Sequence, residues 1–188
     1  MSTHAFSVFF AILALACWAG TATIVVCAIA HRRAPDASLG VLYEDLAPLA
    51  LAIAALVAIV TTAGSLYYSE IAHFTPCKLC WYQRIAMYPL AVVLPIAAFR
   101  RDRDIWHYVV PPAVIGAGFA IYHTQLQAFP SQHSSFCTTL EPCTVRYVWQ
   151  FGFVSLPFMA LSAFTIIIAL VLTARSSEII DEQAADET

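Results

Sequence analysis

Five long apolar stretches take up most of the chain and constrain its fold more than any single motif does. Each of them is long enough for the roughly 20 residues that a transmembrane helix requires. Because 61% of the 188 residues are hydrophobic and 11% are charged, a soluble globular domain is excluded. We therefore expect an all-α membrane protein whose transmembrane helices cover approximately residues 6–30, 46–68, 81–99, 105–127 and 153–174.

The first stretch has to be distinguished from a cleaved signal peptide, because Ala28-Ile29-Ala30 resembles the small-x-small pattern of a cleavage site. A signal peptide carries basic residues before its apolar segment, whereas the first basic residues here, Arg32 and Arg33, follow it. The apolar run is also longer than the roughly 7–15 residues of a signal sequence. We expect residues 1–45 to form an additional, retained N-terminal transmembrane helix and a cytoplasmic loop.

The basic residues indicate the orientation of the helices, since short loops rich in Lys and Arg remain in the cytoplasm. With five transmembrane helices, six of the nine basic residues fall on one side, namely Arg32, Arg33, Arg100, Arg101, Arg103 and Arg175. Lys78, Arg84 and Arg146 fall on the other side. This asymmetry predicts an acidic, solvated cytoplasmic tail over residues 175–188, and it places the N-terminus and residues 129–151 outside. The net charge of −3 argues against nucleic acid as a partner.

The six cysteines fall into three pairs, which differ in whether they can form a disulfide or take part in redox chemistry. Cys17 and Cys27 are ten residues apart, which corresponds to about 15 Å along a helix and is too far for a disulfide. Cys77 and Cys80 form a Cys-x-x-Cys motif directly after Pro76, a residue suited to a first helical turn. At a helix N-terminus the dipole lowers the pKa of a thiol, which favours redox chemistry. The alternative for such a motif is half of a structural zinc site.

The third pair, Cys137 and Cys143, lies in the long polar connection over residues 129–151. A purely structural disulfide is one interpretation of this pair. A long connection without periodicity is usually functional or disordered, however, and this one faces the same compartment as Cys77 and Cys80. Two dithiol pairs on one side of a membrane can pass a disulfide between them by thiolate attack. Because the sequence contains no haem, flavin or nicotinamide motif, we expect a membrane quinone as the electron acceptor.

Three polar side chains are candidates for contacting the quinone. Arg84 follows Cys80 by four residues and shares its helix face, where a guanidinium can stabilise a thiolate and a reduced quinone oxygen. The alternative is an interfacial arginine that extends to the lipid headgroups. His123 and Gln127, also four residues apart, can hydrogen-bond a quinone carbonyl, although a histidine near a helix end is often only interfacial. The weaker candidates near the same region are Glu70, His73 and Gln83.

Several separate motifs occur in a fixed order: Gly64-Ser65-Leu66-Tyr67-Tyr68-Ser69-Glu70, Pro76-Cys77-x-x-Cys80-Trp81-Tyr82-Gln83-Arg84, Met87-Tyr88-Pro89-Leu90, His123-Thr124-x-Leu126-Gln127, Cys137-x5-Cys143 and Phe151-Gly152-Phe153. With these motifs the chain resembles the DsbB/BdbC family of membrane disulfide-bond formation proteins over about residues 46–174. The short spacing of the last cysteine pair is similar to that of BdbC-like members. The resemblance implies a four-helix transmembrane core over residues 46–174 in a bacterial cytoplasmic membrane. The family does not explain the helix in residues 1–45.

The resemblance also implies an order for the two cysteine pairs. Cys137–Cys143 would be the disulfide that oxidises a DsbA-like, extracytoplasmic partner of thioredoxin fold, with Cys137 as the attacked sulfur. Cys77–Cys80 would then reoxidise that pair. The chain would be a disulfide-generating thiol:quinone oxidoreductase that supports disulfide formation in exported proteins.

On the quinone side, the resemblance implies that Cys80 faces the quinone, that Arg84 supports the quinone step and that His123 lies nearby. The sequence leaves open whether the quinone is ubiquinone or menaquinone. Two alternative functions also stay open. One is a quinone reductase of the vitamin-K-epoxide-reductase type, which the early position of the Cys-x-x-Cys motif disfavours. The other is a non-enzymatic membrane scaffold with an external zinc site formed by Cys77, Cys80, Cys137 and Cys143.

Overall fold

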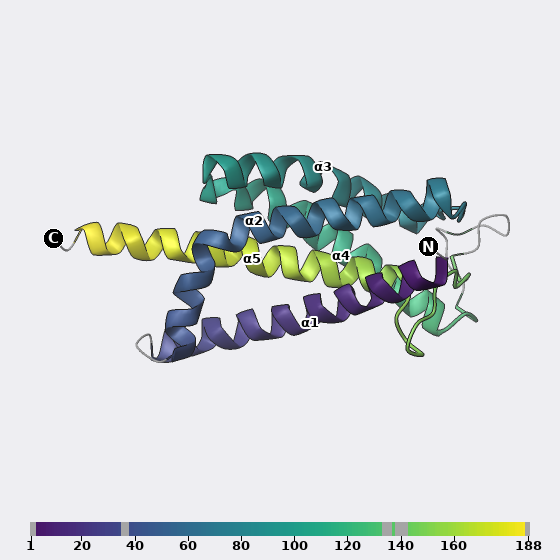
Figure 1. Cartoon of the computed structure of the whole chain (residues 1–188), viewed down its shortest axis with the longest axis horizontal. Helices are drawn as coiled ribbons and strands as arrows, with labels where there is room; N and C mark the ends of the chain where they lie inside the picture. Colours follow the sequence, from purple (N-terminus) through teal and green to yellow (C-terminus); the bar gives the residue numbers. More distant parts are fainter. Residues whose placement is uncertain (1–2, 35–37, 133–136, 138–142, 187–188) are drawn as a thin grey trace.

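The computed structural model describes residues 3–34, 38–132, 137 and 143–186. Within this part of the chain the helical elements are α1 (Thr3–Arg33), α2 (Ser38–Leu66), the π-helical η1 (Tyr67–Ile71), α3 (Lys78–Arg100), the 3₁₀-helical η2 (Arg103–Ile105), α4 (Trp106–Ala128) and α5 (Leu156–Asp186) (Figure 1). The described residues form no β-strand beyond an isolated bridge between Gln150 and Val154. Five helical segments in them are long and apolar enough to cross a membrane. The predicted all-α membrane fold is therefore confirmed.

The helix boundaries differ from the predicted ones at two places that matter for the site and the tail. α3 begins at Lys78, with Cys77 as its N-cap residue, rather than at Pro76. The acidic tail continues α5 as a helix as far as Asp186, and residues 187–188 lie outside the described residues.

The core forms where α2, α3, α4 and α5 face one another. Each helix contacts the next in this order and α5 contacts α2, which closes a four-helix bundle. Gly116 allows α4 to approach its neighbours, because a Cβ atom at this position would clash with the Phe164 ring of α5 and lie 2.9 Å from the Cβ of Ala86 in α3. The largest fully buried side chains of the core include Leu90, Leu94, Val109, Phe164, Ile167 and Leu170.

α1 packs outside this bundle, against α2 and α5 (Figure 1). Its N-terminal half is tied to the end of α2 and to η1. The Phe6 ring stacks on the Tyr67 ring with centroids 3.6 Å apart, and the Tyr68 hydroxyl donates to the Ser7 hydroxyl at 3.2 Å. Farther along, α1 diverges from the bundle and α2 bends after its first turns (Figure 1). Pro48 lies inside α2 and accounts for a bend, because proline removes a helical hydrogen bond and clashes with the preceding turn.

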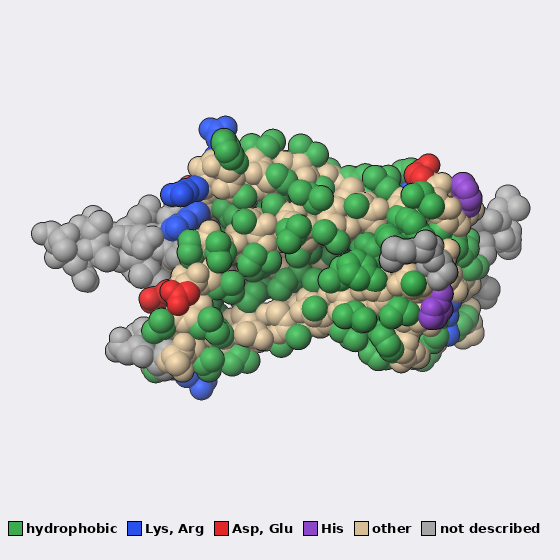
Figure 2. All heavy atoms as spheres, in the orientation of Figure 1, with side chains coloured by type: hydrophobic (Ala, Val, Ile, Leu, Met, Phe, Trp, Pro, Cys, Tyr) green, Lys and Arg blue, Asp and Glu red, His purple; other side chains and the backbone are tan. Residues whose placement is uncertain are grey.

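The two ends of the bundle differ in charge. Most of the Lys and Arg side chains visible in Figure 2 lie at the end that carries the C-terminus, while the visible histidines lie at the end that carries the N-terminus. Arg32 and Arg33 end α1, Arg100 ends α3 and Arg103 precedes α4. The basic residues that the sequence assigned to one side of the membrane therefore gather at one end of the fold.

Candidate active site

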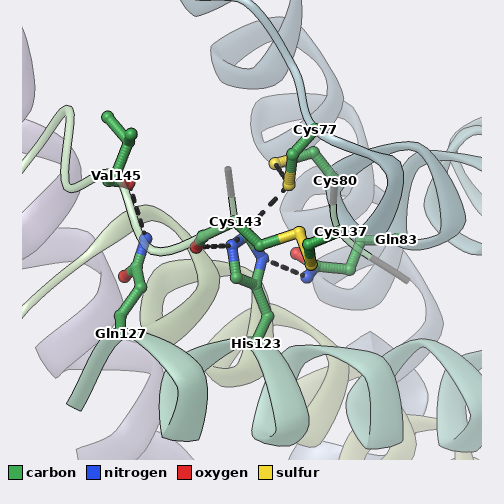
Figure 3. Close-up of a disulfide and its surroundings, with 8 residues drawn as sticks. All are labelled: Cys77, Cys80, Gln83, His123, Gln127, Cys137, Cys143 and Val145. Carbon is green, nitrogen blue, oxygen red and sulfur yellow. Dashed lines mark hydrogen bonds between the residues drawn. A yellow bond between two sulfur atoms is a disulfide. The ribbon is translucent and has the colours of Figure 1, made fainter. Parts of the chain in front are cut away.

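Four cysteines lie at the end of the bundle that carries the N-terminus (Figure 3). Cys77 is the N-cap residue of α3, and Cys80 lies in the first turn of that helix. Cys137 and Cys143 belong to the segment between α4 and α5, of which residues 133–136 and 138–142 lie outside the described residues. All four cysteines share one apolar cluster with side chains of α3 and α4. We call Cys77 and Cys80 the helix pair, and Cys137 and Cys143 the loop pair.

The two pairs are in different redox states. The loop pair forms a disulfide whose Cα atoms lie 5.8 Å apart. The helix pair consists of free cysteines whose sulfur atoms lie 3.2 Å apart. Closing a disulfide between them requires the sulfurs to approach by only about 1 Å. The structure thus corresponds to the state in which the helix pair carries two electrons and the loop pair is oxidised.

His123 joins the two pairs. It lies near the end of α4 and is 3% exposed. Its Nε2 atom is 3.1 Å from the Cys143 carbonyl oxygen and 3.8 Å from the Cys77 sulfur, while its Nδ1 atom is 3.2 Å from the Gln83 amide nitrogen. A carbonyl only accepts hydrogen bonds, so Nε2 carries the proton and Nδ1 accepts from Gln83. His123 therefore connects the backbone of the loop pair with a sulfur of the helix pair (Figure 3).

The surroundings of Cys77, which precedes the membrane-spanning part of α3, lower the pKa of its thiol to about 4. The hydrogen bond with the Cys80 thiol contributes most, burial acts in the opposite direction, and the hydrogen bond with His123 adds to the lowering. The N-terminal end of a helix dipole favours the same anion. Cys77 is therefore a thiolate at neutral pH, and Cys80 donates its S–H to it.

Arg84 is fixed within the protein. Its Nε atom donates to the Ser65 hydroxyl and one of its terminal nitrogens donates to the Ser65 carbonyl, both at 3.0 Å. The Tyr88 hydroxyl is 3.2 Å from the same serine hydroxyl, and the guanidinium lies 5.3 Å from the centroid of the Trp81 ring. This conformation differs from that of an arginine that extends to lipid headgroups, because the side chain crosses to α2. The guanidinium lies beside a cavity, one helical turn beyond Cys80.

Gln127 uses its amide N–H to hold the segment after the loop pair. Its Nε2 atom donates to the Val145 carbonyl at 3.0 Å, and its own backbone carbonyl accepts from the Arg146 Nε atom at 3.0 Å. The Arg146 guanidinium also lies 4.0 Å from the centroid of the Trp149 ring. The Gln127 Oε1 atom is buried and has no hydrogen-bond partner among the described residues. An amide oxygen accepts hydrogen bonds, so this atom can accept one from a ligand hydroxyl, and the predicted contact of Gln127 with a quinone stays a prediction.

A cavity of about 290 Å³ opens beside the helix pair. Its polar lining comes mainly from the region of the helix pair and includes Cys77, Cys80, Gln83, Arg84 and His123. The remaining lining is largely apolar and comes mainly from α1, α2 and α5, with further residues from α3 and from the chain before α5. An apolar cavity with a few converging polar groups is typical of a small-molecule site.

The three weaker candidates for contacting the quinone differ in their positions relative to the cavity. Glu70 and His73 are exposed and do not line the cavity, whereas Gln83 is 7% exposed and bound to the site histidine. Cys17 and Cys27 are free cysteines, as their spacing predicted. Cys17 lines the cavity, and Cys27 is buried in the core.

The geometry does not form the four-thiolate zinc site that the sequence left open, because the loop pair is joined in a disulfide. The described residues do contain a smaller group with suitable ligand types. The ligand atoms of Cys77, Cys80 and His123 all lie within 4.8 Å of one another.

Sequence reasoning assigns no role to Ser65 and Arg146 and only a minor one to Gln83. The position of Gln83, three residues after Cys80 on the same helix face, is a signal that could have identified it. Ser65 belongs to a quoted motif, but its contact with Arg84 joins two different helices. The contacts of Arg146 depend on the path of the chain after the loop pair, for which the sequence carries no local pattern.

The chain is similar to known disulfide bond formation proteins. The family model described as "Disulfide bond formation protein DsbB" matches residues 47–174. "Disulfide bond formation protein C" from Bacillus subtilis (strain 168) is 47% identical over 114 residues, which cover 60% of this chain and 83% of that protein. A "Probable disulfide formation protein" from Deinococcus radiodurans is 41% identical over 150 residues, which cover 72% of this chain and 94% of that protein. No solved structure matches the chain significantly.

Proposed function

The chain belongs to the DsbB family of disulfide bond formation proteins, and we propose that it is a thiol:quinone oxidoreductase of a bacterial cytoplasmic membrane. As a multi-pass membrane member of this family it takes part in disulfide formation, an oxidoreductase activity. The proposed thiol substrate is an extracytoplasmic, DsbA-like dithiol oxidase of thioredoxin fold. The proposed electron acceptor is ubiquinone or menaquinone. The observation that carries the proposal is the contact of His123 with both cysteine pairs beside the cavity.

The loop pair reacts with the soluble partner. A thiolate of the reduced partner attacks Cys137, a mixed disulfide forms and the Cys143 thiolate leaves. The partner's second thiolate then attacks the partner sulfur of the mixed disulfide and releases the Cys137 thiolate. The partner is now oxidised and the loop pair carries two electrons. Cys137 suits the role of attacked sulfur because it is partly exposed, whereas Cys143 is 2% exposed.

The reduced loop pair then reduces the helix pair in its disulfide form. Cys143 attacks Cys77, and Cys80 leaves as a thiolate. Cys137 next attacks Cys143, which restores the loop disulfide and releases Cys77. The lowered pKa of Cys77 supports this last step, because a thiol of low pKa is a good leaving group. His123 supports the first step, because it holds the Cys143 backbone and the Cys77 sulfur in one place.

The helix pair finally reduces the quinone. One thiol, one thiolate, one quinone and one proton become one disulfide and one quinol, so both electrons of the helix pair end on the quinol and one of its two protons comes from the surrounding water. Cys80 faces the quinone, and the Cys77 thiolate forms the disulfide with Cys80. The Arg84 guanidinium, one turn beyond Cys80, stabilises negative charge on the reduced quinone oxygen.

Quinone reduction driven by a reduced thioredoxin-fold partner tests this function. The purified protein is mixed with the reduced partner and a ubiquinone or menaquinone analogue, and both the quinone absorbance and the partner thiols are followed. We expect one quinol for each partner disulfide that forms. Partner oxidation without quinol formation, or no reaction with either quinone type, would contradict the proposal.

A metal-holding scaffold is the second candidate, and the three clustered ligand atoms of Cys77, Cys80 and His123 favour it. Metal analysis of protein purified without chelators distinguishes the two functions. A scaffold requires stoichiometric zinc that is lost in His123→Ala. The oxidoreductase requires none, and its quinone turnover should not change when a chelator is added.

We propose that the end with both cysteine pairs faces out of the cytoplasm. The gathering of basic residues at the opposite end supports this orientation. Cysteines introduced as Asp102→Cys and Gln132→Cys can be labelled in intact cells with an impermeant thiol reagent. We expect labelling of the second variant and not of the first, and the reverse pattern would overturn the orientation.

A further inference from the structure

The most N-terminal helix forms one wall of the cavity beside the helix pair. α1 precedes residues 47–174, so the family assignment gives it no role. One face of α1 nevertheless lines the cavity, with residues at positions i, i+3, i+4 and i+7 of the helix. These residues are Phe10, Leu13, Ala14 and Cys17.

The contacts of α1 with the bundle are specific. A Cβ atom at position 64 would overlap the Phe10 ring, so Gly64 allows this ring to lie directly on α2. The Phe10 ring also packs edge-on against Tyr68, which holds Ser7 through a buried hydrogen bond. The N-terminal half of α1 is therefore positioned by the core, and its cavity-lining face has a defined place.

α1 covers the side of the four-helix bundle where α2 and α5 meet, because it contacts both of these helices. The surface in Figure 2 is hollowed between α1 and the rest of the bundle. The cavity therefore has its polar groups near the helix pair and an apolar wall that continues along α1. Opposite α1 this wall is formed by Leu56, Val57 and Val60 of α2 and by Met159, Ala160 and Ala163 of α5.

This distribution matches an amphiphile with a polar ring and a long apolar chain, which is the chemistry of a membrane quinone. We propose that α1, together with α2 and α5, forms the binding site for the polyprenyl tail of the quinone, so that the tail leaves the ring site along the Phe10–Cys17 face. This inference rests on the proposed quinone function. Lipid is as apolar as the cavity wall, so α1 contributes the shape of the channel rather than a gain from leaving water. Blocking the channel should therefore matter more than removing a contact.

Leu13→Trp narrows the channel, and Ile12→Trp is its matched control, because Ile12 is 54% exposed and does not line the cavity. Both variants are assayed with two quinones that share one ring, one with a long prenyl tail and one without a tail. For Leu13→Trp we expect the KM of the tailed quinone to rise about tenfold and that of the tail-free quinone to change less than about twofold. For Ile12→Trp we expect neither KM to change by more than about twofold.

Equal effects of Leu13→Trp on the two quinones, or equal effects of the two variants on the tailed quinone, would overturn the tail site while leaving the proposed function intact. A wild-type protein that reduces neither quinone would overturn the function itself and the tail site with it. A second measurement does not depend on the variants. A quinone with a photoreactive group on its tail should label residues 10–17 of the wild-type protein, and labelling confined to α2 and α5 would contradict the inference.

Discussion

The helix pair and the loop pair each consist of two cysteines, but different parts of the structure hold them in place. The first turn of α3 fixes the helix pair at the cavity, where the short contact between the sulfurs and the contact with His123 favour one thiolate against the opposing effect of burial. The loop pair lies between two helices and is tied to the bundle after Cys143, where Gln127 binds Val145. Under the proposed function, two cysteine pairs with the same chemistry act on different substrates because of their positions. The helix pair would meet an oxidant dissolved in the membrane, and the loop pair would meet a soluble dithiol.

The strongest test of this comparison removes one cysteine from each pair. Cys143→Ala leaves Cys137 without its intramolecular partner, so a mixed disulfide between Cys137 and the soluble partner should accumulate. Cys77→Ala leaves Cys80 unable to close a disulfide, so the loop pair should accumulate in the reduced form. Both variants should lose turnover by about 1,000-fold or more, as expected for residues that act as one unit. Non-reducing gels of acid-trapped cells distinguish the two products.

Cys27→Ala serves as the control for these two variants, because Cys27 is a free cysteine buried in the core and does not line the cavity. It should retain activity. A partner adduct that maps to Cys77 or Cys80, with the loop cysteines dispensable, would reverse the proposed order and reduce the loop disulfide to a structural role.

The connection between the pairs can be tested through the pH dependence of the helix pair. The pKa of Cys77 is about 4, below the ordinary value of a thiol. Its thiolate therefore stabilises the reduced native state above the ordinary thiol pKa of about 8.5, and this contribution is lost as the pH falls through the lowered pKa. His123→Ala removes one of the interactions that lower the pKa of Cys77. The acid side of the pH–rate profile for quinone reduction should therefore move to higher pH. We expect a rate that is lower by roughly twofold or more near pH 5 and little change near pH 9.

The measurement is single-turnover quinone reduction by the chemically reduced protein, together with the ultraviolet absorbance of the thiolate. His123→Gln is the matched variant, because an amide N–H can still donate to the Cys143 carbonyl. It should show a smaller shift than His123→Ala. An acid limb that stays in place in both variants would mean that His123 positions the loop without affecting Cys77.

Local patterns in the sequence were sufficient for the helices and for part of the site. Hydrophobic length predicts the transmembrane helices, because a bilayer sets a minimum span, and spacing along a helix places Arg84 on the same face as Cys80. The contact between His123 and Cys77 joins residues 46 positions apart, and no local rule predicts it. The same holds for Ser65, which fixes Arg84 from another helix, and for Phe10, which lines the cavity from a helix outside the family match. Such contacts depend on how the helices pack against one another, and no periodic pattern in a single sequence predicts that packing.

A smaller effect concerns the quinone side alone. Arg84 uses two nitrogens on the Ser65 hydroxyl and carbonyl, a fork that an ammonium group cannot reproduce. Arg84→Lys should therefore raise the quinone KM by about fivefold, with a larger rise in Arg84→Ala, while partner oxidation in a single turnover stays unchanged. Steady-state quinone kinetics and partner thiol titration measure the two sides separately. An unchanged quinone KM in both variants would assign Arg84 a purely structural role between α2 and α3.

The smallest effect that we predict concerns the support of the loop pair. Arg146 donates to the Gln127 carbonyl and lies over the Trp149 ring, so it ties the chain after Cys143 to the end of α4. Arg146→Gln removes the charge and the guanidinium that donates to the Gln127 backbone carbonyl, but it leaves the bond between Gln127 and Val145 in place. Because one of the two contacts that hold this segment remains, kcat/KM for the soluble partner should fall only about twofold to threefold, and the quinone KM should not change.

Arg146→Lys, which keeps the charge, separates the contribution of the charge from that of the contact with Gln127. If the charge alone steers the partner, this variant should behave like the wild type and the loss in Arg146→Gln should diminish at high salt. If the tie to Gln127 matters, both variants should lose activity equally at every ionic strength. A change in the quinone KM in either variant would contradict the separation of the two pairs, because it would show that the support of the loop pair also shapes the cavity.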